Sequence, residues 1–254
     1  MATHPFGGSR ADSDRRLQLW DLVMEQARGS PAAVGHVGAV VISSVRVDAT
    51  AVAVTLAASP REVVYTSDQV AEELEELAMT LGEGPGVDAL TDGPALAADL
   101  SDASCRRRWP MFAPAAVTLG VRAVFALPLQ VGGIHLGVLD LYRSEPGSLD
   151  RTQFADALLL ADTACALLLD AGTGAGDGRR PEEAGLQHPE VHQATGMIVA
   201  QIGVSAAVAL VRLRAYAYSH DQRLRDVAAD VVARRLRFQY ETRAATDPGD
   251  HNSA

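Results

Sequence analysis

The chain has 254 residues, of which 48% are hydrophobic, enough for one large domain or two smaller ones with real cores. Its two cysteines, Cys105 and Cys165, are too few for a disulfide framework, and no Cys/His spacing indicates a metal site or a cofactor. Residues 1–16 carry no apolar run, and no segment approaches the roughly 20 apolar residues that span a bilayer. We therefore expect a soluble cytoplasmic protein that makes no membrane contact.

The N-terminal two thirds of the sequence predict a sheet with flanking helices. After a disordered start (1–14), we expect a helix (14–28) and then two strands (50–57 and 61–67) joined by a Ser59-Pro60 turn. A helix (68–81) with outward carboxylates and a Gly/Pro loop with a short extended piece (81–90) follow. The last expected elements are a helix (109–119), two strands joined by Gly132-Gly133, and a helix from Asp150. This order is typical of a mixed antiparallel sheet, which makes the fold class α+β.

A linker and a small helical domain follow. Residues 171–186 are rich in glycine and poor in apolar side chains, which predicts a flexible linker. Between 187 and 243, three short amphipathic patterns predict an all-α three-helix bundle, with Ser205 as the N-cap of its second helix. Residues 244–254 are expected to be a disordered tail.

Charge is distributed unevenly between these two parts. All 22 basic residues are arginines. Residues 1–178 hold 12 of them against 23 acidic residues, a net charge of −11, whereas residues 187–243 hold 8 against 5, a net charge of +3. Two interpretations remain open: a solvated basic helix face, or a C-terminal domain that meets a polyanion which the acidic part repels.

Residues 15–170 resemble a GAF domain. The resemblance rests on the LGEGPG loop (81–86), the ALPLQVGGIHLGVLDLYR hairpin (126–143) and the closing helix. It implies a sensory or dimerising domain with a small-molecule ligand that the sequence does not identify. The chain has no lysine and therefore lacks the signature of cyclic-nucleotide GAF domains. Apolar surface on the helices at 14–28 and 150–169 predicts a homodimer.

The segment HQATGMIVAQIGVSAAVALVRLRAYAYSHDQRLRDVAADVV (192–232) resembles an ANTAR domain, the RNA-binding module of bacterial transcription antiterminators. The matching residues are Ala194, Gly196, Leu213, Arg214, Ala217, Leu224, Val227 and Ala228. Thr195 departs from the family, because many relatives carry Lys there, and His220 stands where Asn is common. The resemblance implies that a dimer binds paired small hairpin loops in nascent RNA.

A glycine inside the first helix of this segment raises the question of what approaches it. Gly196 costs about 1 kcal/mol relative to alanine in a helix interior. Small residues there would admit an RNA base close to the backbone, and nearby arginines would contact phosphates. The candidate RNA-binding residues are Gln193, Ala194, Thr195, Gly196, Arg214, Ala217, Arg223 and Arg225. The alternative, that Gly196 only permits a tight helix crossing, stays open.

Two other functions are compatible with parts of the sequence. RLRDVAADVV (223–232) resembles part of a DNA-binding helix-turn-helix, but a recognition helix would present polar side chains to the major groove rather than alanines and valines. Some GAF proteins are redox enzymes that need a nucleophilic and a resolving thiol. Here Cys165 lies on an apolar helical stripe and no other nucleophile–base pair emerges, so we expect a regulator and not an enzyme.

Overall fold

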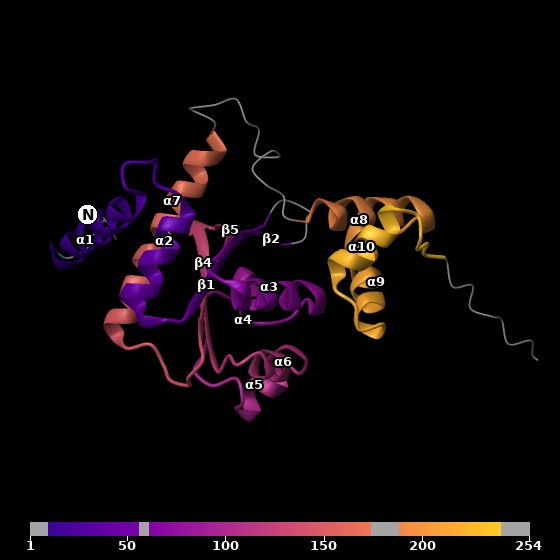
Figure 1. Ribbon diagram of the computed structural model, residues 1–254, viewed down its shortest axis with the longest axis horizontal. Coiled ribbons are helices and arrows are strands. Elements are labelled where there is room, and N and C mark those ends of the chain that lie inside the picture. The colour runs from indigo at the N-terminus through magenta and orange to yellow at the C-terminus, as the bar shows by residue number, and fades with distance from the viewer. Residues whose placement is uncertain (1–9, 56–60, 174–187, 240–254) are drawn as a thin grey trace, which may run out of the picture.

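The computed structural model describes residues 10–55, 61–173 and 188–239 (Figure 1). The expected turn at Ser59-Pro60, most of the expected linker and the C-terminal tail lie outside these residues. In the described part, no single helix is long and apolar enough to cross a membrane, although the bent pair Pro189–Ile202 and Ala206–Ser219 has the length and composition to do so.

A five-stranded antiparallel sheet forms the centre of the N-terminal domain. The strands are β1 (Ala49–Val54), β2 (Glu62–Thr66), β3 (Ala95–Ala97), β4 (Ala123–Val131) and β5 (Ile134–Arg143). Their order is β2-β1-β5-β4-β3, and all four pairings are antiparallel. The predicted Gly132-Gly133 turn joins β4 to β5, where Val131 pairs with Ile134 and Gly132 has a φ of +59°. The predicted antiparallel sheet is confirmed.

Helices cover both faces of the sheet and make a three-layer domain (Figure 1). One layer holds α1 (Arg10–Ala27), α2 (Val34–Val41), the π-helix η1 (Ile42–Arg46) and α7 (Arg151–Thr173). The other holds α3 (Gln69–Leu81), α4 (Pro85–Asp92), α5 (Ala103–Arg108) and α6 (Phe112–Thr118). Alternate strand residues feed the two cores, since Phe125 packs with the first layer and its neighbour Val124 with the second.

Three helices form the C-terminal bundle, as the sequence predicts: α8 (Pro189–Ile202), α9 (Ala206–Ser219) and α10 (Leu224–Val232). Val191, Ile198, Leu213 and Val227 are fully buried in its core. The predicted N-cap is present, because the Ser205 hydroxyl accepts a hydrogen bond from the amide of Val208 at 3.3 Å. The predicted fold class, α+β with an all-α C-terminal bundle, is confirmed.

Several predicted boundaries were wrong. Helix α1 begins at Arg10, inside the segment expected to be disordered, and α7 continues to Thr173, into the expected linker. The apolar run at residues 34–46 is helical, although no element was predicted there. Residues 85–92 form a helix instead of a loop. Pro85 is compatible with this helix because it occupies the first turn, where a missing amide hydrogen costs nothing.

Candidate nucleic-acid interface

The outward side of α8 contains Gly196, the glycine in the interior of this helix. Gln193, Gly196 and Ala200 are exposed and lie on the side of α8 opposite its buried residues. A methyl group placed on Gly196 would have no atom of the described residues within 4 Å, apart from the backbone of its own helix. No helix crossing within the described chain therefore explains this glycine.

Three of the predicted RNA-binding residues lie instead in the core of the bundle. Ala194 and Ala217 are fully buried, and Thr195 is 8% exposed. The Thr195 hydroxyl donates to the carbonyl of Val191 at 2.7 Å, so its hydrogen-bonding capacity is used within α8. The expectation that these three side chains face RNA needs correction, since Ala194 and Thr195 lie on the buried side of α8 and Ala217 lies on the buried side of α9.

Arg214 contacts the N-terminal domain. Its Nε donates to the carbonyl oxygen of Met79 at 2.8 Å, near the end of α3. The guanidinium lies against Gly82, which ends α3 with a φ of +67°; a methyl group there would lie 2.8 Å from Nη1 of Arg214. Burial lowers the pKa of Arg214, because desolvation disfavours its charged form.

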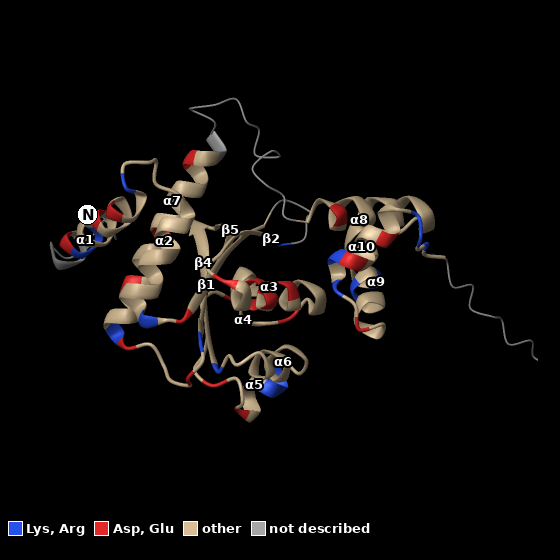
Figure 2. Cartoon of the chain, viewed as in Figure 1, with Lys and Arg blue, Asp and Glu red and all other residues tan. Residues whose placement is uncertain are grey.

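Arg223 and Arg225, at the start of α10, pair with carboxylates of α3. Figure 2 marks the acidic residues along α3 in red and the basic residues of the C-terminal helices in blue. Arg223 Nη1 lies 3.3 Å from Glu76 Oε2, and Arg225 Nε lies 3.1 Å from Glu76 Oε1. Arg225 Nη1 also lies 3.8 Å from Glu72 Oε1. Burial raises the pKa of Glu76, and the two arginines act in the opposite direction.

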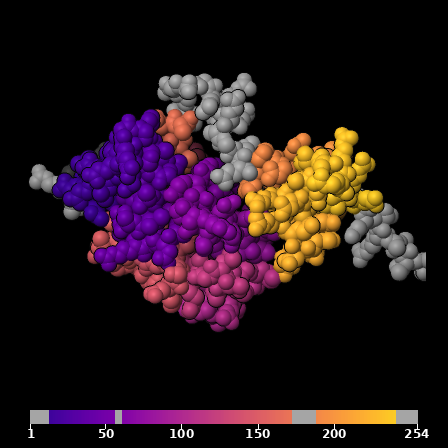
Figure 3. All heavy atoms as spheres, in the orientation of Figure 1, coloured from indigo at the N-terminus to yellow at the C-terminus, as the bar shows by residue number. Residues whose placement is uncertain are grey.

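Helix α3 therefore has two buried faces, one in each domain. Leu74 and Ala78 pack in the N-terminal core, whereas Met79 packs with the core of the C-terminal bundle. The carboxylates of this helix were expected to face solvent, yet Glu75 is 2% and Glu76 7% exposed. That expectation was wrong for both residues: Glu75 binds Arg61 inside the N-terminal domain, and Glu76 lies on the side of α3 that contacts α9 and α10. Figure 3 shows the C-terminal domain lying directly against the N-terminal one.

Further polar contacts join the domains on either side of Glu76. Glu62 of β2 accepts from the amide of His188 at 3.2 Å and lies 3.0 Å from Nε2 of His192. The amide of Leu224 donates to the Thr80 hydroxyl at 3.3 Å. This bond satisfies the first amide of α10, which has no partner within its own helix.

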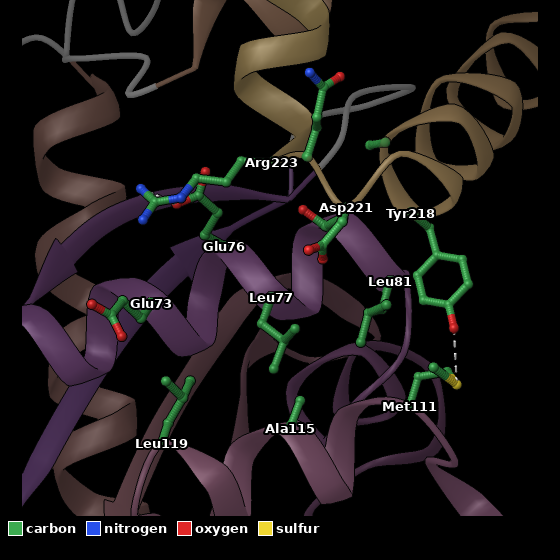
Figure 4. Close-up of a pocket in the computed structure, with 13 residues that line it drawn as sticks. Glu73, Glu76, Leu77, Leu81, Met111, Ala115, Leu119, Tyr218, Asp221 and Arg223 are labelled. Atoms are coloured by element: carbon green, nitrogen blue, oxygen red, sulfur yellow. Dashed lines mark hydrogen bonds and ion pairs between the residues drawn. The ribbon is translucent and has the colours of Figure 1, made fainter.

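A groove of about 520 Å³ runs along the line where the domains meet (Figure 4). Leu77 and Leu81 of α3 and Ala115 of α6 line it from the N-terminal side, and Tyr218 and Arg223 from the C-terminal side. The Tyr218 hydroxyl reaches the sulfur of Met111 across it, at 3.5 Å. Among the described residues, no group of three His, Cys, Asp or Glu side chains is arranged to hold a metal ion.

A second ionic cluster lies entirely inside the N-terminal domain. Arg61, directly before β2, pairs with Glu75 of α3 at 2.6 Å and with Asp140 of β5, and the Tyr142 hydroxyl donates to Glu75 at 2.7 Å. All of these side chains are buried. Gly86 closes the cluster from α4, since a methyl group on it would lie 2.5 Å from Nη1 of Arg61. Sequence reasoning did not identify these residues, because they are far apart in the chain.

The fold and the contacts define a two-domain protein in which an acidic helix of an α+β domain binds the arginines of a small helical domain. Residues 182–232 match the family model of the ANTAR domain. The C-terminal bundle is therefore an ANTAR domain, as its sequence resemblance indicates.

The chain is also similar to solved structures, whereas a search of curated proteins finds no match to it. One is the GAF domain of a phosphoenolpyruvate-protein phosphotransferase from Coxiella burnetii, with 18% identity, a TM-score of 0.49, and coverage of 66% of this chain and 100% of that chain. The corresponding Acinetobacter GAF domain has 11% identity, a TM-score of 0.46, and coverage of 68% and 100%. The chromophore-binding domain of an R. palustris bacteriophytochrome has 10% identity, a TM-score of 0.46, and coverage of 66% and 64%.

Proposed function

We propose that this protein is a cytoplasmic RNA-binding transcription antitermination regulator. Its ANTAR domain binds paired small hairpin loops in nascent RNA, and its GAF-like N-terminal domain controls that binding in response to a ligand. The match of residues 182–232 to the ANTAR family carries the proposal. Antitermination requires preferential binding of one RNA fold and no catalytic group.

The open face of α8 supports RNA as the ligand. Single-stranded loops are recognised through splayed bases that approach side chains and backbone closely. Gly196 leaves the backbone accessible, and the exposed amide of Gln193 beside it is able to donate to and accept from a base edge. Gln193 and Gly196 remain candidates on this face, and Arg214, Arg223 and Arg225 are the candidate phosphate contacts once they are free of α3.

The two other functions have less support. Helix α10 has nine residues and buries Leu224, Val227 and Val231. Few of its side chains are therefore left to contact base edges in the major groove. Burial raises the pKa of both thiols, Cys105 and Cys165, which reduces the thiolate that redox catalysis requires. We therefore propose RNA rather than duplex DNA as the target, and no enzymatic activity.

Gly196→Leu tests the RNA face. Leucine is a better helix former than glycine, so the helix should persist while its side chain blocks close approach. We expect RNA affinity to fall by about tenfold or more, the equivalent of one lost close contact of ~1.4 kcal/mol. The measurement is fluorescence anisotropy with a pool of paired-hairpin RNAs carrying randomised loops, with duplex DNA as competitor and circular dichroism as the folding check.

Two variants control this experiment. Gly196→Ala adds only a methyl group and should bind almost normally. Arg237→Ala removes an exposed arginine beyond the end of α10 and should also change little. Normal binding by Gly196→Leu would place the RNA face elsewhere on the bundle.

We also propose that the N-terminal domain forms a homodimer, which would offer two RNA sites to two hairpins. Apolar side chains are exposed on both outer helices, among them Leu17 (62%) and Met24 (41%) of α1 and Leu169 (41%) of α7. Arg15 holds α1 against α7 through Asp156 at 2.5 Å. Exposed apolar surface of this kind marks an association site.

Light scattering tests the dimer. The double variant Leu17→Glu, Met24→Glu should convert a dimer to a monomer, because it puts charges into an apolar contact. Ile134→Glu is the matched control, since Ile134 is 67% exposed at the tip of the β4–β5 hairpin, away from α1. A wild-type monomer at micromolar concentration would contradict the proposal.

A further inference from the structure

The arginines proposed to bind RNA are all engaged by the N-terminal domain in this structure. Arg214 donates to the backbone of Met79, and its guanidinium is packed on Gly82. Arg223 and Arg225 share the carboxylate of Glu76. Phosphate groups bind arginine through the same guanidinium groups, so RNA and α3 would compete for these three side chains.

The surface of α3 that makes these contacts has the charge of a nucleic-acid backbone. Glu72 and Glu76 are one helical turn apart and present two carboxylates to the start of α10. Arginine binds carboxylate and phosphate oxygens with the same planar donors. The sequence led us to expect that the acidic domain repels a polyanion. In the structure, the acidic domain also binds the arginines itself, through the carboxylates of α3.

Apolar and backbone contacts hold the carboxylates in position. Met79, one turn from Glu76, is 3% exposed and packs with the core of the ANTAR domain. The Thr80 hydroxyl accepts the first amide of α10, another group that would otherwise be available to a phosphate. The contact between α3 and the ANTAR domain therefore combines apolar packing at Met79 with ion pairs at Glu76.

We infer that α3 is an autoinhibitory helix, and that this structure is the state that excludes RNA. The inference rests on the proposed function. Helix α3 and RNA compete for Arg214, Arg223 and Arg225, and the ANTAR domain binds RNA only after it leaves α3. Because α3 belongs to the same chain, it competes at a high effective concentration. The apparent affinity for RNA is then reduced by the fraction of molecules that remain closed.

Neighbouring residues provide a route from the interior of the N-terminal domain to this contact. Arg61 and Glu75 bind each other inside the domain, while Glu62 and Glu76, in each case the next residue along the chain, bind the ANTAR domain. A change that shifts α3 against β2 therefore alters both sets of contacts. This geometry allows a signal received inside the domain to release the ANTAR domain.

The double variant Glu72→Gln, Glu76→Gln in the full chain tests the inference. Glutamine keeps the shape and removes the charge, so the ANTAR domain should separate more often from α3. We expect at least a tenfold gain in affinity for the paired-hairpin RNA pool. RNA affinity of the wild type should also fall less steeply with salt, because salt weakens the competing contact with α3 too.

Glu73→Gln is the matched control, because Glu73 lies on the same helix, accepts a hydrogen bond from Gln69 at 2.8 Å and pairs with no arginine among the described residues. Small-angle X-ray scattering measures domain separation without RNA. Separation of the double variant with tighter RNA binding, and a Glu73→Gln variant like the wild type, would support the inference.

The other outcomes distinguish the two proposals. If the wild type binds RNA, and the ANTAR domain of the double variant separates from α3 without binding RNA more tightly than the wild type does, the autoinhibition would be overturned. A double variant that does not separate would overturn it too, since the carboxylates would not be what holds the domains together. Separation without RNA binding by any variant would instead overturn the proposed RNA function.

Discussion

Two ionic clusters of this protein use neighbouring carboxylates of the same helix, α3, and differ in where they lie. The inner cluster joins Arg61 to Glu75 and Asp140 within the N-terminal domain, and its side chains are at most 7% exposed. The outer cluster joins Arg223 and Arg225 to α3 between the domains, and these arginines are 53% and 33% exposed. The inner cluster is thus sealed from water, whereas the outer one is partly wet.

This difference in exposure determines what each cluster contributes. Charges without water depend entirely on their partners, so loss of one partner is costly. Charges that remain partly hydrated lose little when they separate, because water replaces the partner. We therefore assign the inner cluster to the stability of the N-terminal domain and the outer cluster to a contact that opens and closes.

The largest effect should come from Arg61→Met, which removes the one cation of the inner cluster. Methionine fills a similar volume but leaves Glu75 and Asp140 buried beside each other. We expect the free energy of unfolding to fall by about 3–5 kcal/mol in urea denaturation. Arg122→Met is the control, because its partner Asp99 is partly exposed and the loss should be much smaller. Equal losses would show that burial does not separate the two kinds of pair.

The next effect is a pH dependence that belongs to the inner cluster. Burial raises the pKa of Asp140 from 3.8 to about 8, an effect that Arg61 opposes and Glu75 reinforces. The folded protein then keeps a proton that the unfolded chain releases. The resulting stabilisation is complete below about pH 4 and is lost as pH rises through about 8.

Asp140→Asn removes this titration and nearly preserves the shape of the side chain. The wild type should lose stability relative to this variant by up to ~1.4 kcal/mol per pH unit between about pH 5 and about pH 8. Chemical denaturation of both proteins across that range measures the difference. Parallel stability curves would mean that Asp140 is already ionised in the folded state.

The two domains also differ in how much the sequence could predict. The three ANTAR helices follow from local information, namely apolar residues at helical spacing such as Leu213 and Ala217 and the cap at Ser205. The same information assigned the carboxylates of α3 to solvent. Periodicity reports that Glu76 lies off the N-terminal core, but it does not report that a second domain covers that side.

Other features were missed for different physical reasons. Residues 34–42 are nearly all apolar or glycine, since many of them pack in the core between the sheet and the outer helices, and such a run has little period to detect. The partners of Arg61 come from two separate elements, α3 and β5, and only the fold brings them together. A signal for the domain contact was present, because the acidic helix at 68–81 and the arginines at 223–225 have opposite charges.

The smallest predicted effect compares two glycines with the same backbone and different surroundings. Gly82 ends α3 and Gly203 ends α8, both with a φ of +67°. Alanine in this left-handed conformation costs roughly 1–2 kcal/mol wherever it is placed. A methyl group on Gly203 would have no described neighbour within 4 Å outside its own helix, whereas one on Gly82 would lie 2.8 Å from Nη1 of Arg214.

Gly203→Ala should therefore show the backbone cost alone, and Gly82→Ala the same cost plus a displaced Arg214. Because the guanidinium is the end of a flexible side chain, it should move aside and weaken its bond to Met79, a further loss of about 0.5–1.5 kcal/mol. Thermal unfolding measures the cost, and amide hydrogen exchange in residues 206–219 measures release of α9 from α3. Faster exchange only in Gly82→Ala is expected, because only that substitution touches the contact between the domains. Equal behaviour of the two variants would show that Arg214 does not depend on the missing side chain at Gly82.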